Sequence, residues 1–272
     1  MNQSKEINSY MNELGSGAKE ASKILSQSSL EQRNDALMHI SAQIESNREE
    51  ILRVNKEDLT RAREKSIGSA LIDRLELNDD RIDSMISGLK VVSELPDPVG
   101  EITPLDPTPS GIDVSRMRVP LGVVGIIYES RPNVTADAAA LCLKSGNACL
   151  LRGGSEAILS NKIIWNCLQN GLELSGLPRE CVQLVETTDR EAVKTLLHLD
   201  KFLDVIIPRG GKGLVKLITE ESRVPVIKHL DGICHVYIDG AADFKKAEEI
   251  AFNAKTYRYG ICGAMETLLI HK

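Results

Sequence analysis

The sequence predicts an α/β protein in which a doubly wound, mostly parallel sheet follows a helical N-terminal layer. Before residue 95, apolar residues recur at intervals of three and four positions, which is typical of helices that bury one face. After residue 120, short apolar runs alternate with longer amphipathic stretches, the pattern of parallel strands connected by helices. The 272 residues are enough for one large or two ordinary domains.

The boundary between these two regions is rich in proline. The helical layer includes Ala36, Ile40 and Ile44, which share one helical face. Five prolines between residues 96 and 109 then end it, because proline lacks the backbone N–H that a helix interior needs. Alternating polar and apolar residues from 111 to 119 predict an exposed strand or hairpin arm.

The strands and helices of the sheet are expected in strict alternation. Residues 121–128 form a continuous apolar run, which suits a strand buried on both faces. Further strands are expected at residues 148–151, 181–185, 203–207, 233–238 and 266–270, and helices at 134–144, 156–174, 190–199, 214–220 and 242–258.

The composition restricts the class of protein. A net charge of −6 without a basic block gives no reason to expect nucleic acid or an anionic membrane as a partner. No run approaches the roughly 18 apolar residues of a membrane span, and the polar N-terminus lacks a hydrophobic secretion signal. The six cysteines form no C-x-x-C pair and the histidines no pair at ligand spacing, so neither disulfides nor a metal site is expected. We therefore expect a cytoplasmic protein.

Two strand-to-helix junctions are rich in glycine. Arg152-Gly-Gly-Ser-Glu156 follows one predicted strand, and Pro208-Arg-Gly-Gly-Lys-Gly213 follows another. Glycines at the carboxyl end of a parallel strand let backbone N–H groups approach a phosphate at the start of the next helix. Neither run matches the common dinucleotide or P-loop patterns, and each alone can be a tight turn. Two such turns in one sheet, each beside a basic residue, favour a nucleotide site.

Two further positions have the character of reactive or binding residues. Asn133 lies just beyond the strand at 121–128, as a helix N-cap or as an amide donor in a site. Cys262 has Gly260 and Gly263 beside it and Lys255 and Arg258 upstream, the positive surroundings that a reactive thiolate needs. The alternative is an inert, buried cysteine. The other five cysteines lie in apolar patterns and are expected in the core.

Five stretches together resemble the gamma-glutamyl phosphate reductases (glutamate-5-semialdehyde dehydrogenases) of the aldehyde dehydrogenase superfamily. The resemblance extends over essentially the whole chain and predicts an aldehyde-dehydrogenase-like fold. The stretches are Val119-Pro-Leu-Gly-Val-Val-Gly-Ile-Ile-Tyr-Glu-Ser-Arg-Pro-Asn-Val-Thr135, Leu150-Leu-Arg-Gly-Gly-Ser-Glu-Ala157, Ile206-Ile-Pro-Arg-Gly-Gly211, His229-Leu-Asp-Gly-Ile-Cys-His-Val-Tyr237 and Asn253-Ala-Lys-Thr-Tyr-Arg-Tyr-Gly-Ile-Cys262.

The resemblance implies a role for individual residues. Cys262 corresponds to the nucleophile and Asn133 to the amide of the oxyanion hole. Arg152 and Glu156 fall where superfamily members bind the adenosine ribose. The cofactor-binding residues implied are Arg152, Gly153, Gly154, Ser155, Glu156, Arg209, Gly210 and Gly211, and the substrate-binding residues are Lys255 and Arg258.

The implied reaction is the second step of proline biosynthesis. A member of this family reduces L-glutamyl 5-phosphate to L-glutamate 5-semialdehyde with NADPH and releases phosphate, through a thioester on the cysteine. A homo-oligomer is implied for the full-length form. Hydrolytic superfamily members carry a Glu that activates water, whereas the similar segment here, His229-Leu-Asp-Gly232, has none. A reductase that must protect its thioester from water gains nothing from such a base.

Family members also continue well beyond the length of this chain. We therefore expect a dinucleotide-binding domain at 1–232, with an arm at about 97–119, and only the start of a truncated catalytic domain at 233–272. The strand at 266–270 would then lack sheet neighbours, and the chain would bind a dinucleotide without measurable turnover. Two other functions stay open: another acylating member, such as a coenzyme-A-acylating aldehyde dehydrogenase, and a non-catalytic nucleotide-binding fragment. An enzyme needs a reactive Cys262, whereas a binding protein needs only the two glycine-rich turns.

Overall fold

The protein forms two compact units, Met1–Lys228 and His229–Lys272. The structure is a computed structural model that describes residues 2–106, 110–228, 232–259 and 261–272. Pro107 and Pro109 of the proline-rich boundary, Gly260 beside the predicted nucleophile, and residues 229–231 of the segment without a glutamate lie outside the described residues.

The N-terminal part of unit 1 is helical, as predicted. Two of its helices begin with a capping side chain: Ser29 accepts a hydrogen bond from the backbone N–H of Gln32, and Asn78 accepts one from that of Arg81. The last helix ends at Glu94, shortly before the first proline of the boundary. These helices are α1 (Asn2–Leu25), α2 (Leu30–Ser46), α3 (Arg48–Glu64), α4 (Ser69–Leu75) and α5 (Asp79–Glu94).

A four-stranded parallel sheet forms the centre of unit 1. Its strand order is β5-β4-β3-β6, so the chain moves outward from β3 on one side and then crosses to β6 on the other. Its elements are β3 (Val123–Tyr128), α6 (Asn133–Lys144), β4 (Ala148–Arg152), η1 (Ser155–Ala157), α7 (Ile158–Leu174), η2 (Arg179–Cys181), β5 (Val182–Leu184), α8 (Arg190–Leu197), β6 (Val205–Arg209) and α9 (Lys212–Glu221). The carboxyl ends of β3 and β6 flank the point where the winding direction reverses, where sheets of this type bind ligands.

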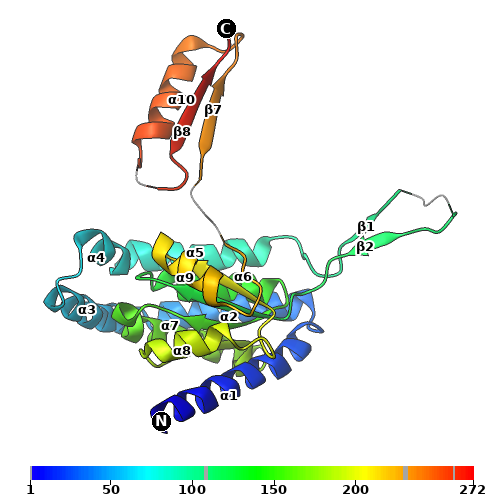
Figure 1. Cartoon of the computed structure of the whole chain (residues 1–272), viewed down its shortest axis with the longest axis vertical. Helices are drawn as coiled ribbons and strands as arrows, with labels where there is room; N and C mark the ends of the chain where they lie inside the picture. The colour runs from blue at the N-terminus through cyan, green and yellow to red at the C-terminus, as the bar shows by residue number, and fades with distance from the viewer. Residues whose placement is uncertain (1, 107–109, 229–231, 260) are drawn as a thin grey trace. The chain divides into compact units, whose positions relative to one another are not determined.

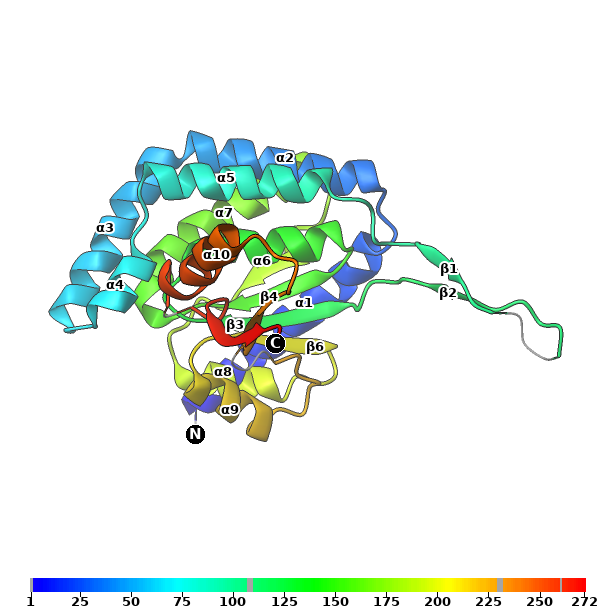
Figure 2. The same ribbon diagram turned by 90° about the horizontal axis from the view of Figure 1, so that it is seen from above.

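Helices cover both faces of this sheet (Figure 2). Val124 and Ile126 of β3 pack in one core with residues of α2, α5, α6 and α7. Val123 and Ile127 of the same strand pack in a second core with residues of α1, α8 and α9. Every residue of β3 and β4 is therefore buried, which explains their continuous apolar sequence. The doubly wound α/β prediction is confirmed.

The predicted arm is a hairpin of two short antiparallel strands, β1 (Ile102–Pro104) and β2 (Ser115–Met117). The sequence indicated β2 but not β1, because β1 lies inside the proline-rich boundary and contains Pro104. A proline is compatible with the edge of so short a ladder. Both strands are exposed along their whole length.

Unit 2 is a strand–helix–strand unit in which α10 packs on the two strands (Figure 1). It comprises β7 (Cys234–Ile238), α10 (Phe244–Thr256) and β8 (Met265–Ile270). The prediction that the last strand lacks sheet neighbours is wrong, since β8 pairs with β7 in parallel, with Val236 opposite Leu268. The helix begins at its cap Asp243 and ends at Thr256, so Arg258 lies in the following loop and not in the helix as expected.

A buried polar cluster fixes the start of α7, just beyond the first glycine-rich turn. Asp58 of α3 accepts hydrogen bonds from the backbone N–H and the hydroxyl of Ser160, at 2.8 and 2.7 Å. Asn55 donates to the same hydroxyl at 3.0 Å. Burial raises the pKa of Asp58 above its usual value, against the lowering effect of the bonds from Ser160. The helical layer therefore positions the helix that follows β4.

The contact between α2 and α7 depends on Gly171. A Cβ atom at this position would lie 2.7 Å from the backbone nitrogen of Ile40 and 2.9 Å from its Cα, and backbone atoms cannot move aside. We expect Gly171→Ala to reduce the free energy of unfolding by about 1–3 kcal/mol, the usual cost of overpacking. Trp165 of α7 is the only tryptophan, so its fluorescence during urea denaturation measures the change.

Gly88 of α5 is the matched control, because a Cβ atom there meets only Asp137 Oδ1, at 3.8 Å. Gly88→Ala should leave stability unchanged or raise it by about 0.4–1 kcal/mol, since alanine restricts the unfolded chain. Equal effects of the two substitutions would show that α2 and α7 do not approach as closely as described.

Candidate functional site

Three loops lie together at the carboxyl edge of the sheet in unit 1. They follow β4, β3 and β6, which are adjacent parallel strands, so their carboxyl ends share one edge. The predicted cofactor-binding residues and Asn133 lie in these loops or at the ends of the elements beside them. Cys262, Lys255 and Arg258 belong to unit 2.

The turn after β4 begins with a buried arginine. Arg152 is 8% exposed, and its guanidinium donates hydrogen bonds to the backbone oxygens of Gly153 and, at 3.5 Å, Thr188. Burial lowers the pKa of Arg152 from its usual value, and its Nε has no hydrogen-bond partner. A Cβ atom on Gly153 would lie 3.0 Å from the Tyr128 ring, so only glycine fits between strand and turn.

A chain of polar side chains lies beneath this turn. The Tyr128 hydroxyl is 2.7 Å from the Thr135 hydroxyl, which donates to Asn161 Oδ1 at 3.1 Å. Burial raises the pKa of Tyr128. The amide nitrogen of Asn161 is fully buried and has no partner. Buried polar side-chain atoms in folded proteins almost always have a hydrogen-bond partner, so this unpaired donor is an unusual feature of the turn.

Glu156 connects the turn after β4 to the loop after β3. Its Oε1 accepts hydrogen bonds from the backbone N–H of Ser130 at 2.8 Å and from the Ser130 hydroxyl at 2.5 Å. Ser130 is 3% exposed and has φ of +29°, a backbone conformation that non-glycine residues rarely adopt. The carboxylate expected to bind a ribose is therefore engaged with this strained loop. Ser155 beside it is exposed and Gly154 half-buried.

Glu129 connects the loop after β3 to the turn after β6. Its Oε2 accepts a hydrogen bond from the backbone N–H of Gly211 at 2.9 Å. Its own N–H donates to the backbone oxygen of Arg209 at 3.2 Å. A Cβ atom on Gly210 would lie 2.8 Å from the carboxyl carbon of Glu129. Arg209, Gly210 and Gly211 are exposed, so this turn is accessible to a ligand.

Asn133 is the first residue of α6 and does not cap it. The N-cap position is occupied by Pro132, so the capping alternative for Asn133 is wrong. The half-buried Asn133 amide donates to Asp137 Oδ2 at 2.8 Å. Burial raises the pKa of Asp137, and the bond from Asn133 opposes that shift. Asp137 therefore fixes the orientation of the Asn133 amide.

In unit 2, Cys262 lies in the loop between α10 and β8 and is exposed. Two turn hydrogen bonds shape this loop, from Ile261 N–H to Arg258 O at 3.2 Å and from Ala264 N–H to Ile261 O at 3.1 Å. The alternative of a buried cysteine is therefore wrong for Cys262, and its reactivity stays a prediction.

The remaining cysteines were all expected in the core. This is correct for Cys142, Cys149, Cys167 and Cys181, and burial raises the pKa of both Cys167 and Cys181 to about 12. It is wrong for Cys234, which is only half-buried and donates to the backbone oxygen of Cys262 at 3.3 Å. The first residue of β7 therefore contacts the cysteine loop.

The two basic residues of unit 2 have different environments. The Lys255 ammonium donates to the backbone oxygen of Met265 at 2.9 Å and forms an ion pair with Glu266 at 3.4 Å. Its charge is thus partly compensated by Glu266. Arg258 is exposed in the cysteine loop.

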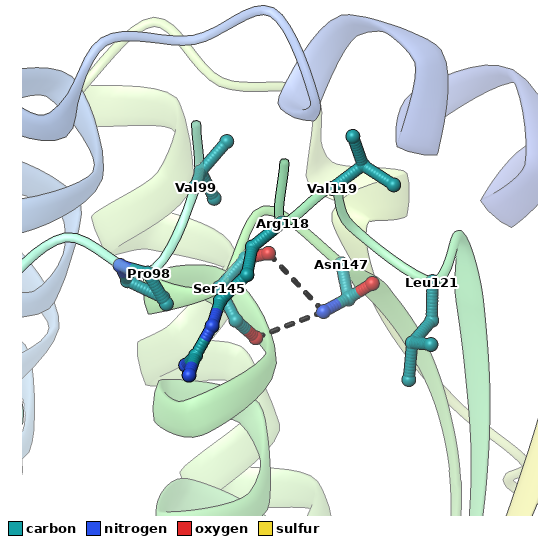
Figure 3. A pocket seen from close by; sticks show the side chains of 7 residues that line it. All are labelled: Pro98, Val99, Arg118, Val119, Leu121, Ser145 and Asn147. Carbon is teal, nitrogen blue, oxygen red and sulfur yellow. Dashed lines mark hydrogen bonds between the residues drawn. The ribbon is translucent and has the colours of Figure 1, made fainter. Parts of the chain in front are cut away.

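One cavity of about 280 Å³ lies at the opposite edge of the sheet (Figure 3). Leu121 and Asn147, which precede β3 and β4, line it together with Arg118 from the end of the hairpin. The Asn147 amide is held by the backbone oxygen and hydroxyl of Ser145. Because this cavity lies far along the strands from the glycine-rich turns, it is not part of the candidate site.

The described residues lack a metal-binding cluster and a membrane-spanning helix. Within them, no three histidine, cysteine or acidic side chains are grouped so as to bind a metal ion. In the same residues, no helix combines the length and apolar character that crossing a membrane requires.

Sequence reasoning did not assign roles to Glu129, Ser130 or Asn161. Glu129 and Ser130 lie inside a segment quoted for its resemblance, at a strand end where ligands bind, and that position was the available signal. Asn161 lies within an amphipathic helix pattern, which gave no signal at all.

Comparison with known proteins gives consistent matches. The chain matches the aldehyde dehydrogenase family over residues 5–272. It is similar to the solved gamma-glutamyl phosphate reductase of Thermotoga maritima, at 42% identity and a TM-score of 0.88 over 96% of this chain and 63% of that one. The corresponding Saccharomyces cerevisiae enzyme gives 36% identity and a TM-score of 0.75 over 96% of this chain and 65% of that one.

A more distant match adds information on the fold alone. Glyceraldehyde-3-phosphate dehydrogenase GapN from Methanocaldococcus jannaschii, solved in complex with NADP, is 19% identical with a TM-score of 0.62, over 97% of this chain and 56% of that one. The chain therefore spans less than two thirds of the length of each of these relatives. The matches confirm the aldehyde-dehydrogenase-like fold and the resemblance to gamma-glutamyl phosphate reductases.

Proposed function

Because the chain belongs to the aldehyde dehydrogenase family, we propose that its protein is an NADPH-dependent reductase that converts L-glutamyl 5-phosphate to L-glutamate 5-semialdehyde, with release of phosphate, in proline biosynthesis. The observation that supports this substrate is the 42% identity to a gamma-glutamyl phosphate reductase across 96% of the chain. The exposed Cys262 and the glycine-rich turns at the sheet edge agree with it.

In this proposal Cys262 is the nucleophile. Its sulfur attacks the acyl carbon of the substrate, phosphate leaves, and a thioester forms on the cysteine. The cofactor, when bound, supplies the hydride that reduces this thioester. The sulfur then leaves as the carbonyl reforms, which releases the aldehyde. Lys255 and Arg258 are the proposed contacts to the anionic groups of the substrate.

Asn133 is the proposed donor to the oxyanion of the tetrahedral intermediate. An asparagine amide has two N–H groups, and the bond to Asp137 uses one of them. The other remains available for a substrate oxygen, in an orientation fixed by that bond. A preorganised donor of this kind stabilises charge that develops only in the transition state.

The carboxyl edge of the sheet is the proposed cofactor site. Gly210 and Gly211 are exposed at the start of α9, where backbone amides suit a diphosphate. A side chain at Gly210 would meet Leu214 at 2.6 Å, so the turn stays open only with glycine. The turn from Arg152 to Glu156 is the proposed ribose site, and the preference for NADPH over NADH is part of the proposal.

We also propose a cytoplasmic homo-oligomer. The six cysteines are all free in the structure, and the hairpin β1–β2 exposes Ile102, Met117 and Val119, apolar residues that suit a contact between subunits. Light scattering after gel filtration, compared between the wild type and Met117→Lys, tests the oligomer.

The proposed function is tested by oxidation of glutamate 5-semialdehyde in the reverse direction, on the protein in its natural length. We expect activity that requires inorganic phosphate and is higher with NADP than with NAD. Coenzyme A in place of phosphate should give none, because the acyl acceptor is phosphate. Activity with coenzyme A alone would instead identify a coenzyme-A-acylating enzyme. Dinucleotide binding by calorimetry, without turnover under any condition, would identify a binding protein.

A further inference from the structure

We infer that Glu129 is a specificity-determining residue of the cofactor site. Its carboxylate accepts a hydrogen bond from the Gly211 N–H, the group to which a cofactor phosphate would bind. Glu129 thereby selects against weakly bound anions at the start of α9. This inference rests on the proposed function, because that function places a dinucleotide at this edge of the sheet.

The position of the Glu129 carboxylate follows from the sheet. Tyr128 of β3 lies opposite Arg209 of β6, and the N–H of Glu129 extends this pairing to the Arg209 oxygen. The two residues that follow β6 are Gly210 and Gly211, which have no side chains to cover the turn. Glu129 Oε2 reaches the Gly211 N–H at 2.9 Å across this gap.

This bond takes the place of an ordinary helix cap. The N-cap residue of α9 is Gly211, which has no side chain, and no acidic residue lies in the first turn of the helix. Glu129 therefore supplies the negative charge that a helix N-terminus favours. A phosphate requires the same amide for the same reason. Two anions cannot share it, so a phosphate must displace the carboxylate.

A separate feature of the same sheet edge is a buried nitrogen atom without a hydrogen-bond acceptor. The Nε of Arg152, which is 8% exposed, has no hydrogen-bond acceptor, and Arg152 ends the strand beside β3. One nitrogen of the Arg152 guanidinium thus lacks an acceptor, whereas its other two donate to backbone oxygens. Glu129 is an anion already bound to the turn after β6. Together they favour a phosphate ligand, whose charge lets it compete with the carboxylate for the amide.

The test compares a charged and a neutral probe. ADP carries a diphosphate, and adenosine has the same base and sugar without it. Glu129→Gln keeps an oxygen that can accept from Gly211 and removes only the charge, so the turn retains its geometry. By calorimetry we expect ADP to bind roughly tenfold more tightly to Glu129→Gln than to the wild type, since a charge-assisted bond no longer competes. Adenosine should bind equally to both.

Glu220→Gln is the matched control, because Glu220 is an exposed residue near the end of the same helix, paired with Lys216 at 3.9 Å. It changes the net charge equally and should leave the affinity for ADP unchanged. Unchanged or weaker binding of ADP by Glu129→Gln, with clear binding by the wild type, would overturn the inference alone. Absence of ADP and NADPH binding in all three proteins would refute the proposed cofactor site as well.

Discussion

Replacing Cys262 with alanine is expected to abolish the phosphate-dependent oxidation of glutamate 5-semialdehyde, with a fall in kcat of roughly 10⁴-fold or more. The sulfur forms the covalent bond to the acyl group in the proposed mechanism, and alanine offers no nucleophile. Formation of NADPH by the purified variant measures the loss. Cys262 is exposed in its loop, so the substitution removes no core contact and the fold should persist.

Cys234→Ser is the matched control for this experiment. Serine keeps a donor for the backbone oxygen of Cys262 but is no substitute for a thiol nucleophile. We expect this variant to keep most of the activity and Cys262→Ala to keep none. Iodoacetamide should inactivate Cys234→Ser by alkylation of Cys262. The semialdehyde, bound at the same cysteine, should protect this variant from inactivation. Turnover by Cys262→Ala would exclude the thioester mechanism.

The Asn133→Ala variant is expected to lose about 10²- to 10³-fold in kcat, the usual effect of removing one oxyanion donor. The affinity for the dinucleotide should change little, because Asn133 starts α6 and does not belong to either glycine-rich turn. Steady-state rates and cofactor titrations of the same preparation separate the two quantities.

Val134→Ala, at the next position of the same helix, is the control for a general disturbance of α6. It shortens a half-buried side chain but leaves the amide in place, so kcat should be retained. If Asn133→Ala keeps the wild-type kcat and only lowers stability, the bond to Asp137 is structural and another group stabilises the oxyanion.

The sequence predicted the four-stranded sheet of unit 1 closely because its central strands, β3 and β4, are buried on both faces. The run 121–128 is continuously apolar, which indicates a strand buried on both faces. Gly146, which has a positive φ, marks the end of the helix before β4. The strand β1 was missed because its proline was interpreted only as a helix breaker. These elements are predicted from residues close together in the sequence. Correct and wrong assignments therefore both come from local patterns.

The candidate site was predictable only in part, for a different physical reason. Glycines and a flanked cysteine are visible in a linear pattern, and so is their place at strand ends. The hydrogen bond between Gly211 and Glu129 joins residues 82 positions apart in the sequence. The bond between Ser130 and Glu156 joins residues 26 positions apart. They depend on which strands are neighbours and in what register. The half-buried state of Cys234 likewise depends on the pairing of β7 with β8.

The bond between Glu156 and Ser130 makes two loops one cooperative element. A ligand hydroxyl that takes the Glu156 carboxylate leaves the Ser130 amide without its acceptor, and a serine held at φ of +29° is then free to relax. Ser130 lies three residues before Asn133, so the proposed binding of a ribose after β4 would change the free energy of the segment that holds the proposed oxyanion donor. Because such coupling is reciprocal, an acyl group bound at Asn133 would alter the affinity for the ribose by the same factor.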